Sequence, residues 1–129
     1  MPAEPVPEPL RSPRDAPPSW TSSTEQTAAA LVVRLSGELD YPGIDALEAL
    51  LDAQLDADPP ALVIDLSEVG FCDSSSLQAL LRVSSRAREQ GVAFALAGAR
   101  RAVTRPIEML NLHEQLPIHA SVDAAVSAL

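Results

Sequence analysis

The chain has 129 residues, enough for one domain around a single hydrophobic core. Its formal net charge is −9 and its nine basic residues are all arginines, which argues against nucleic acid and anionic membranes as partners, because both repel an acidic protein. A single cysteine excludes an intramolecular disulfide. The residues before Trp20 contain no long apolar stretch, so we expect a soluble, cytoplasmic protein without a signal peptide or membrane span.

The start of the chain differs in composition from the rest. Seven of the 12 prolines lie between Pro2 and Pro18, separated by acidic, arginine and serine residues. Such a segment buries little apolar surface. We therefore predict a disordered, proline-rich tail over residues 1–19, either passive or used for docking, and a folded domain over residues 20–129.

Beyond the tail, strand patterns alternate with helix patterns. Strands are predicted at 20–25, 28–35, 61–66 and 92–97, with a short one at 116–119. Helices are predicted from 42 to Pro59-Pro60, at 77–90, at 102–110 and from Ser121 to the end. Strands that alternate with helices pair in parallel through right-handed crossovers. We therefore predict an α/β fold with a mixed, mostly parallel sheet of four to five strands and about four helices.

Three expectations concern details of these helices. The first helix should turn its acidic residues toward water: Asp45, Glu48, Asp52 and Asp56. Thr104 should cap the third helix, so that Pro106 falls in the first turn. In the last helix, Leu129 should point inward.

Three consecutive serines follow a buried strand and precede an amphipathic helix. Asp73 comes first, and Ser74, Ser75 and Ser76 follow it, at a place where open α/β sheets gather ligands and partners. The run is typical of a helix cap, because Asp and Ser accept hydrogen bonds from the N–H groups of a first turn. The alternative is a phosphorylation site, since a phosphate suits the positive end of a helix and adds roughly −1.5 to −2 charges.

Three blocks of sequence resemble the signature of STAS domains, which take their name from sulphate transporters and anti-sigma factor antagonists. The blocks are LSGELD at 35–40, VIDLS at 63–67 and FCDSSSL at 71–77. Their order and spacing resemble the family from about Trp20 to Leu129. The resemblance implies a STAS fold and an anti-sigma factor antagonist: a binding protein, not an enzyme, with no cofactor or metal of its own.

In that family the second hydroxyl of the motif accepts a phosphate, which implies Ser75 here. An anti-sigma factor serine kinase, which holds the ATP, would bind the unphosphorylated form and free its sigma factor; phosphorylation would end that binding. The family's glycine is replaced by Ser76, which adds a competing acceptor at the contact. The alternative within the family is an adaptor subunit of a stressosome-like or lipid-transport complex. We expect a monomer or a weak homodimer.

Further residues are predicted to contact the partner: Asp40, Asp73, Ser74, Ser76, Gln78 and Arg82. Asp40 and Asp73 match acidic positions of the family, although Asp40 also suits a turn, and Asp73 either caps the helix or orients Ser75. Gln78 and Arg82 lie on the polar side of the helix that starts at the serines. The alternative is a solvated face on which Arg86 pairs with Glu89 or Gln90.

Two other classes of site fit poorly. A serine hydrolase requires a nucleophile elbow, and G-x-S-x-G is missing; its base would have to be His113 or His119, both late in the chain. A metal site from His113, Glu114 and His119 would place its ligands on a loop and a strand and not on one helix face. Cys72 is predicted to be a small buried hydrophobic residue.

Overall fold

The computed structural model describes residues 17–129. The predicted tail therefore lies outside the described residues except for its last three positions. The elements follow in this order: β1 (Trp20–Gln26), β2 (Leu31–Leu39), the 3-10 helix η3 (Tyr41–Gly43), α1 (Ile44–Asp56), β3 (Ala61–Cys72), α2 (Ser74–Gln90), β4 (Ala93–Ala97), α3 (Arg101–Met109), β5 (Ile118–His119) and α4 (Val122–Ser127). The predicted α/β class and the predicted alternation of elements are confirmed.

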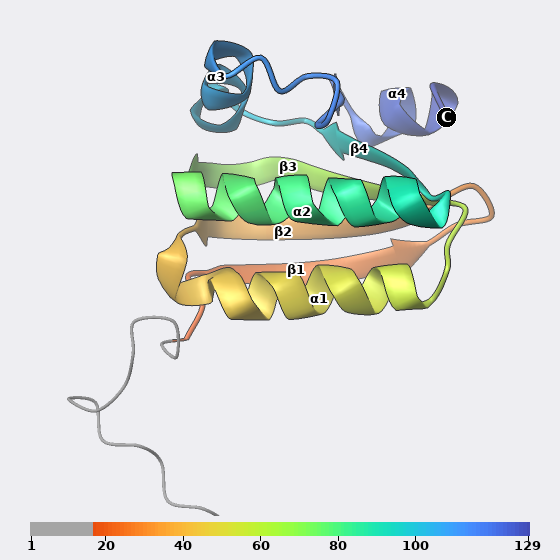
Figure 1. Ribbon diagram of the computed structural model, residues 1–129, viewed down its shortest axis with the longest axis horizontal. Coiled ribbons are helices and arrows are strands. Elements are labelled where there is room, and N and C mark those ends of the chain that lie inside the picture. Colours follow the sequence, from red (N-terminus) through yellow and green to blue (C-terminus); the bar gives the residue numbers. More distant parts are fainter. Residues whose placement is uncertain (1–16) are drawn as a thin grey trace, which may run out of the picture.

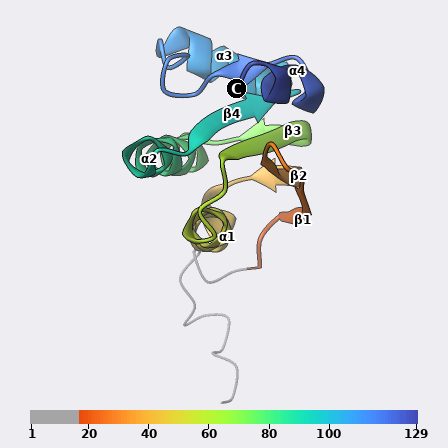
Figure 2. The same cartoon turned by 90° about the vertical axis from the view of Figure 1, so that its right-hand side faces the viewer.

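The five strands form one sheet in the order β1-β2-β3-β4-β5. β1 runs antiparallel to β2, and the other neighbours are parallel. From β2 to β5, each strand is the neighbour of the strand before it in the chain, always on the same side. Right-handed connections between such strands place their helices on one face of the sheet, and α1, α2 and α3 all pack against the same core. α4 covers a smaller cluster formed by small residues of β2, β3 and β4. Figure 2 shows α1 and α2 on one side of the sheet and α4 on the other.

The core is aliphatic, as the low aromatic content of 3% requires. Val33, Ile64 and Leu96 come from the three central strands and are fully buried. Trp20 is the aromatic residue buried at the edge of this core, where its indole N–H donates to the carbonyl of Gly43 over 3.4 Å. The start of β1 is thereby tied to the turn that precedes α1.

β2 and β3 both extend beyond their predicted ends. The pairing of β2 with β3 contains two register shifts, and Gly37 lies between them with φ +116°. A side chain at Gly37 would come within 2.3 Å of the carbonyl oxygen of Ser19, so glycine allows the strand to continue here. After the bulges, Glu38 pairs with Phe71 and Leu39 with Cys72. Two of the sequence blocks thus meet at the carboxyl edge of the sheet.

Three predictions about the helices are wrong. α2 begins at Ser74 and not near Leu77, because Asp73 caps it. α3 begins at Arg101 with Arg100 at its N-cap, so Thr104 is not the cap and Pro106 lies inside the helix, where it cannot donate a backbone hydrogen bond. Leu129 follows the end of α4 and is half exposed. Across residues 17–129, none of the helices combines the length and apolar character needed to cross a membrane.

Candidate functional site

Asp73 joins three elements at the carboxyl edge of the sheet. Its Oδ1 accepts the backbone N–H of Ser76 over 2.8 Å, which caps α2. Its Oδ2 accepts the backbone N–H of Tyr41, also over 2.8 Å, and its own N–H donates to the carbonyl of Leu39. Both carboxylate oxygens are therefore engaged with backbone. Of the two roles considered for Asp73, the structure shows the capping role.

The three serines after Asp73 differ sharply in exposure, although they occupy one helical turn. Ser74 is exposed and Ser75 is half-buried. Ser76 is fully buried, and its hydroxyl has no hydrogen-bond partner among the described residues. Consecutive residues of a helix turn by about 100°, so the third serine points into the core, and the partner contact of Ser76 stays a prediction that its burial does not favour. The replacement of glycine by Ser76 does not add a surface-accessible acceptor.

Ser75 lines a groove of about 340 Å³ between the beginnings of α1 and α2. The α2 side of this groove is formed by Ser75, Gln78, Ala79 and Arg82, and the other side by Tyr41, Ile44 and Glu48. The groove therefore brings together the predicted acceptor and both predicted contact residues of α2. Glu48 was missed by the sequence reasoning, which placed it in open solvent.

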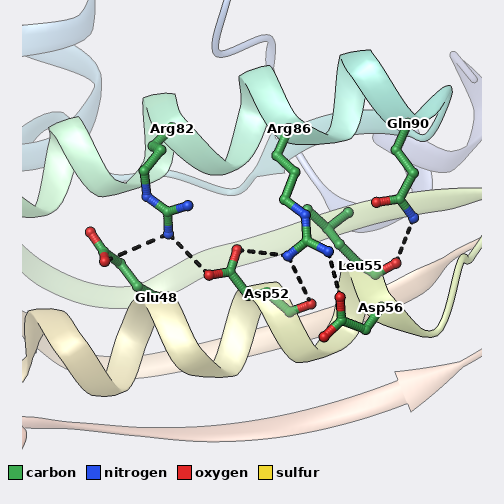
Figure 3. A network of polar contacts seen from close by, with 7 residues as sticks. All are labelled: Glu48, Asp52, Leu55, Asp56, Arg82, Arg86 and Gln90. Carbon is green, nitrogen blue, oxygen red and sulfur yellow. Dashed lines mark hydrogen bonds and ion pairs between the residues drawn. The ribbon is translucent and has the colours of Figure 1, made fainter.

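A ladder of ion pairs joins α1 to α2, and Figure 3 shows it. Arg82 contacts Glu48 at 3.6 Å and Asp52 at 3.2 Å. Arg86 contacts Asp52 at 3.1 Å and Asp56, and its hydrogen bonds to Asp56 and then to Asp52 raise the pKa of Arg86. The ladder continues at the far end of α2, where Gln90 donates to the carbonyl of Leu55.

These contacts correct two sequence expectations. Arg86 pairs across to α1 and not with Glu89 or Gln90 on its own helix. Glu48 and Asp52 do not simply face water, since each is held by an arginine of α2. The reason is that α1 and α2 lie side by side on the sheet (Figure 1), which brings the acidic edge of one helix against the basic edge of the other. Partly exposed pairs of this kind contribute about 0–1 kcal/mol each.

Two exposed aromatic residues flank the site. The chain has only four aromatic residues, yet Tyr41 in η3 is 40% exposed and Phe71 near the end of β3 is 46% exposed. Large exposed apolar side chains beside a polar motif are typical of a protein-binding surface. Sequence reasoning missed both, although the scarcity of aromatic residues and their positions within two residues of Asp73 and Asp40 were available signals.

Asp40 lies at the carboxyl edge of the sheet, one residue after β2. It is the N-cap residue of η3, but its side chain makes no capping hydrogen bond, and its carbonyl accepts the N–H of Gly43. One carboxylate oxygen, Oδ1, is buried without a hydrogen-bond partner among the described residues. The backbone role matches the turn interpretation, and the partner-binding role of Asp40 stays a prediction.

Cys72 is buried, as predicted, and its pKa supports the interpretation as a small hydrophobic residue. Burial, and to a smaller degree the charge of Asp73, raises the pKa of the thiol to about 12. The thiol therefore stays protonated at neutral pH, and a thiol is a poor nucleophile. The histidines considered for a hydrolase or a metal site lie elsewhere: His119 is in β5 and His113 is in the exposed turn after α3.

The fold and this edge define a class: a small α/β protein with a half-buried serine in the first helical turn after a central strand. Sequence comparison gives the family, because the STAS domain model matches residues 21–125. This chain belongs to the STAS domain family. The predicted family and the predicted STAS fold are thereby confirmed.

Individual relatives support this assignment. The anti-sigma-F factor antagonist RsfB of Mycobacterium tuberculosis is 29% identical over 114 residues, which cover 88% of this chain and 93% of that protein. An anti-sigma F factor antagonist of Paenibacillus polymyxa is 30% identical over 81% of this chain and 88% of its own length. The crystal structure of an anti-sigma factor antagonist from Mycobacterium paratuberculosis superimposes with a TM-score of 0.79, at 36% identity over 88% of this chain and 96% of the other.

Proposed function

We propose that this protein is a cytoplasmic anti-sigma factor antagonist whose binding to an anti-sigma factor serine kinase is switched off by phosphorylation of Ser75. The names of its relatives support the antagonist role. The observation that carries the switch is the position of Ser75: half-buried at the groove, in the first turn of α2, between an exposed and a fully buried serine. In this proposal the partner binds the ATP, and the chain itself catalyses nothing.

The phosphoryl transfer requires only a hydroxyl from this protein. The γ-phosphoryl group of ATP on the kinase moves to Oγ of Ser75, the hydroxyl proton leaves, and ADP is the other product. First-turn N–H groups of a helix favour an anion at this position. α2 is therefore expected to keep its structure, and the kinase would be released by added charge and bulk at the interface and not by unfolding.

The proposed contact surface consists of side chains that reach the exterior around Ser75. Ser74, Gln78 and Arg82 of α2 are exposed, and we add the aromatic residues Tyr41 and Phe71 as apolar anchors. Asp40 lies at the margin of this proposed contact surface. Asp73 supports this surface indirectly, because both of its carboxylate oxygens hold backbone groups of η3 and α2. The protein would engage its partner as a monomer or a weak homodimer.

The test uses Ser75→Ala and Ser75→Asp, with Ser85→Ala as a matched control on the exposed side of the same helix. Candidate anti-sigma kinases are taken from the native cell by pull-down, and binding is measured by calorimetry. We expect Ser75→Ala to bind like the wild type and to resist phosphorylation by ATP. Ser75→Asp should fold normally and lose roughly 1–3 kcal/mol of binding free energy, the scale of one mispaired interfacial group. Ser85→Ala should behave like the wild type in both assays.

Two outcomes would contradict the proposal. Full phosphorylation of Ser75→Ala would move the acceptor to another residue, with Ser74 as the exposed candidate. If no serine kinase binds or phosphorylates the wild type, the role of an adaptor subunit in a stressosome-like or lipid-transport complex would replace the antagonist role.

A further inference from the structure

Ser75 and Arg82 lie on the same face of α2 and line the same groove. They are seven residues apart, close to two full helical turns, so their side chains leave the helix in nearly the same direction. The guanidinium of Arg82 contacts Glu48 and Asp52 of α1. Because helical side chains lean toward the N-terminus, this long side chain can also turn along the groove toward Ser75. Between them on this face stand Gln78 and Ala79; the methyl group of Ala79 is buried, and the side chain of Gln78 is exposed, so neither closes the groove between Ser75 and Arg82.

Arg82 shares the groove with an acidic partner from α1. Among the residues that line it, Arg82 supplies the cationic group and Glu48 the anionic group. The contact of Arg82 with Glu48 spans 3.6 Å, whereas the contact with Asp52, outside the groove, spans 3.2 Å. Figure 3 shows the guanidinium of Arg82 between these two carboxylates. The Glu48 contact is the longer and weaker of the two.

A phosphate on Ser75 would change this balance of charges. It brings up to two negative charges and three strong acceptor oxygens into the groove, and guanidinium groups bind phosphate in a bidentate manner. The same charge repels Glu48, which stands on the opposite wall. We propose that Arg82 is the counter-ion of phosphorylated Ser75, and that it exchanges Glu48 for the phosphate while keeping Asp52. This inference rests on the proposed phosphorylation of Ser75.

The exchange gives Arg82 a positioning role, and it transmits the effect of the phosphate from α2 to α1. Glu48 belongs to α1, so loss of its ion pair with Arg82 removes the first contact of the ladder between α1 and α2. The contacts of Arg86 with Asp52 and Asp56 lie further along the ladder and stay in place. Phosphorylation would thus weaken the attachment of the start of α1, next to η3 and Tyr41, to α2, without any change of fold.

The experiment places phosphoserine at position 75 during translation, so that no kinase is needed. The second pKa of the phosphate is then measured by phosphorus NMR at 0.15 M salt, where the Debye length is about 8 Å. Arg82→Gln should raise this pKa by about half a unit or more, because a nearby cation favours the dianion. Glu48→Gln should lower it, because a competing anion is removed. Arg82→Lys should return most of the wild-type value.

Arg86→Gln is the control, since it removes the same charge from the same helix. Residues 75 and 86 are separated by roughly 16 Å along the helix axis, about two Debye lengths, so the phosphate pKa should stay within about 0.2 of the wild type. Equal values for Arg82→Gln and Arg86→Gln, or no change with Glu48→Gln, would overturn the inference. A kinase assay on the unmodified chain tests the proposed function separately, so the two can fail independently.

Discussion

The backbone N–H of Tyr41 donates to a carboxylate oxygen of Asp73 over 2.8 Å, although 32 residues separate them along the chain. The second oxygen of Asp73 caps α2. One side chain thus fixes the turn before α1 relative to the first turn of α2. The groove at Ser75 lies between these two helix beginnings, so its shape depends on a residue that does not line it.

Replacement of Asp73 by alanine should therefore lower stability and distort the groove. We expect a loss of about 1–2 kcal/mol in the free energy of unfolding, the range for an N-cap side chain, measured by urea denaturation. Asp73→Ser can still cap α2 but cannot also reach Tyr41, so it should recover part of the loss. Equal stabilities of Asp73→Ala and the wild type would contradict the role assigned to this carboxylate.

Ser76 should respond to substitution as a core residue. Its hydroxyl is buried without a partner among the described residues, and an unpaired buried hydroxyl costs about 1–3 kcal/mol. Ser76→Ala removes that hydroxyl and adds helix propensity, so the melting temperature should rise or stay unchanged. Ser76→Gly should keep the fold and kinase binding, with a stability about 0.5–1 kcal/mol below that of the alanine variant. Loss of kinase binding in Ser76→Ala would place this residue at the interface after all.

The stability of the protein should fall in alkaline solution because of Cys72. Burial raises the thiol pKa from 9.0 to about 12, so between these values the folded state holds a proton that the unfolded state has lost. This contribution to stability is complete below pH 9 and disappears as the pH rises through 12, with a slope of up to about 1.4 kcal/mol per pH unit.

The measurement is urea denaturation at several pH values in a Tyr41→Phe background, which removes the single tyrosine hydroxyl; the chain contains no lysine. Adding Cys72→Ala should flatten the pH dependence between 9 and 11 while lowering stability at neutral pH. An unchanged slope in the alanine variant would show that another group is responsible. Thiol reagents should modify Cys72 slowly in the folded protein and rapidly in denaturant.

The last residues of the predicted tail belong to the folded unit. The carbonyl of Ser19 accepts the N–H of Glu38 over 3.0 Å, and Pro18 lies beside Gly43. Deletion of residues 1–16 should leave the melting temperature nearly unchanged, as expected for a proline-rich tail. Deletion of residues 1–19 should lower it by several degrees, because the N–H of Glu38 loses its acceptor. Equal melting temperatures for the two truncations would contradict this boundary.

Local sequence patterns determined much of this protein. Alternation of apolar strands and amphipathic helices predicted the element order, and the scarcity of aromatic residues predicted an aliphatic core. Asp73 before three serines suggested a helix cap as one of two roles, and the structure shows that role. The burial of Cys72 was expected from the general behaviour of free cysteine as a small hydrophobic residue. Each of these properties depends on residues within one or two helical turns, or on strand periodicity, which a sequence displays directly.

The tertiary structure alone decided which side chains meet. Arg86 had acidic and amide neighbours on its own helix, but it pairs with Asp52 and Asp56 of α1. Ser76 is in the core because α2 begins three residues earlier than predicted. The groove that joins Ser75 to Arg82 and Glu48 exists because two helices lie side by side on one sheet. Helical periodicity fixes which face a helix buries, but the residues opposite that face are set by the packing of elements far apart in sequence.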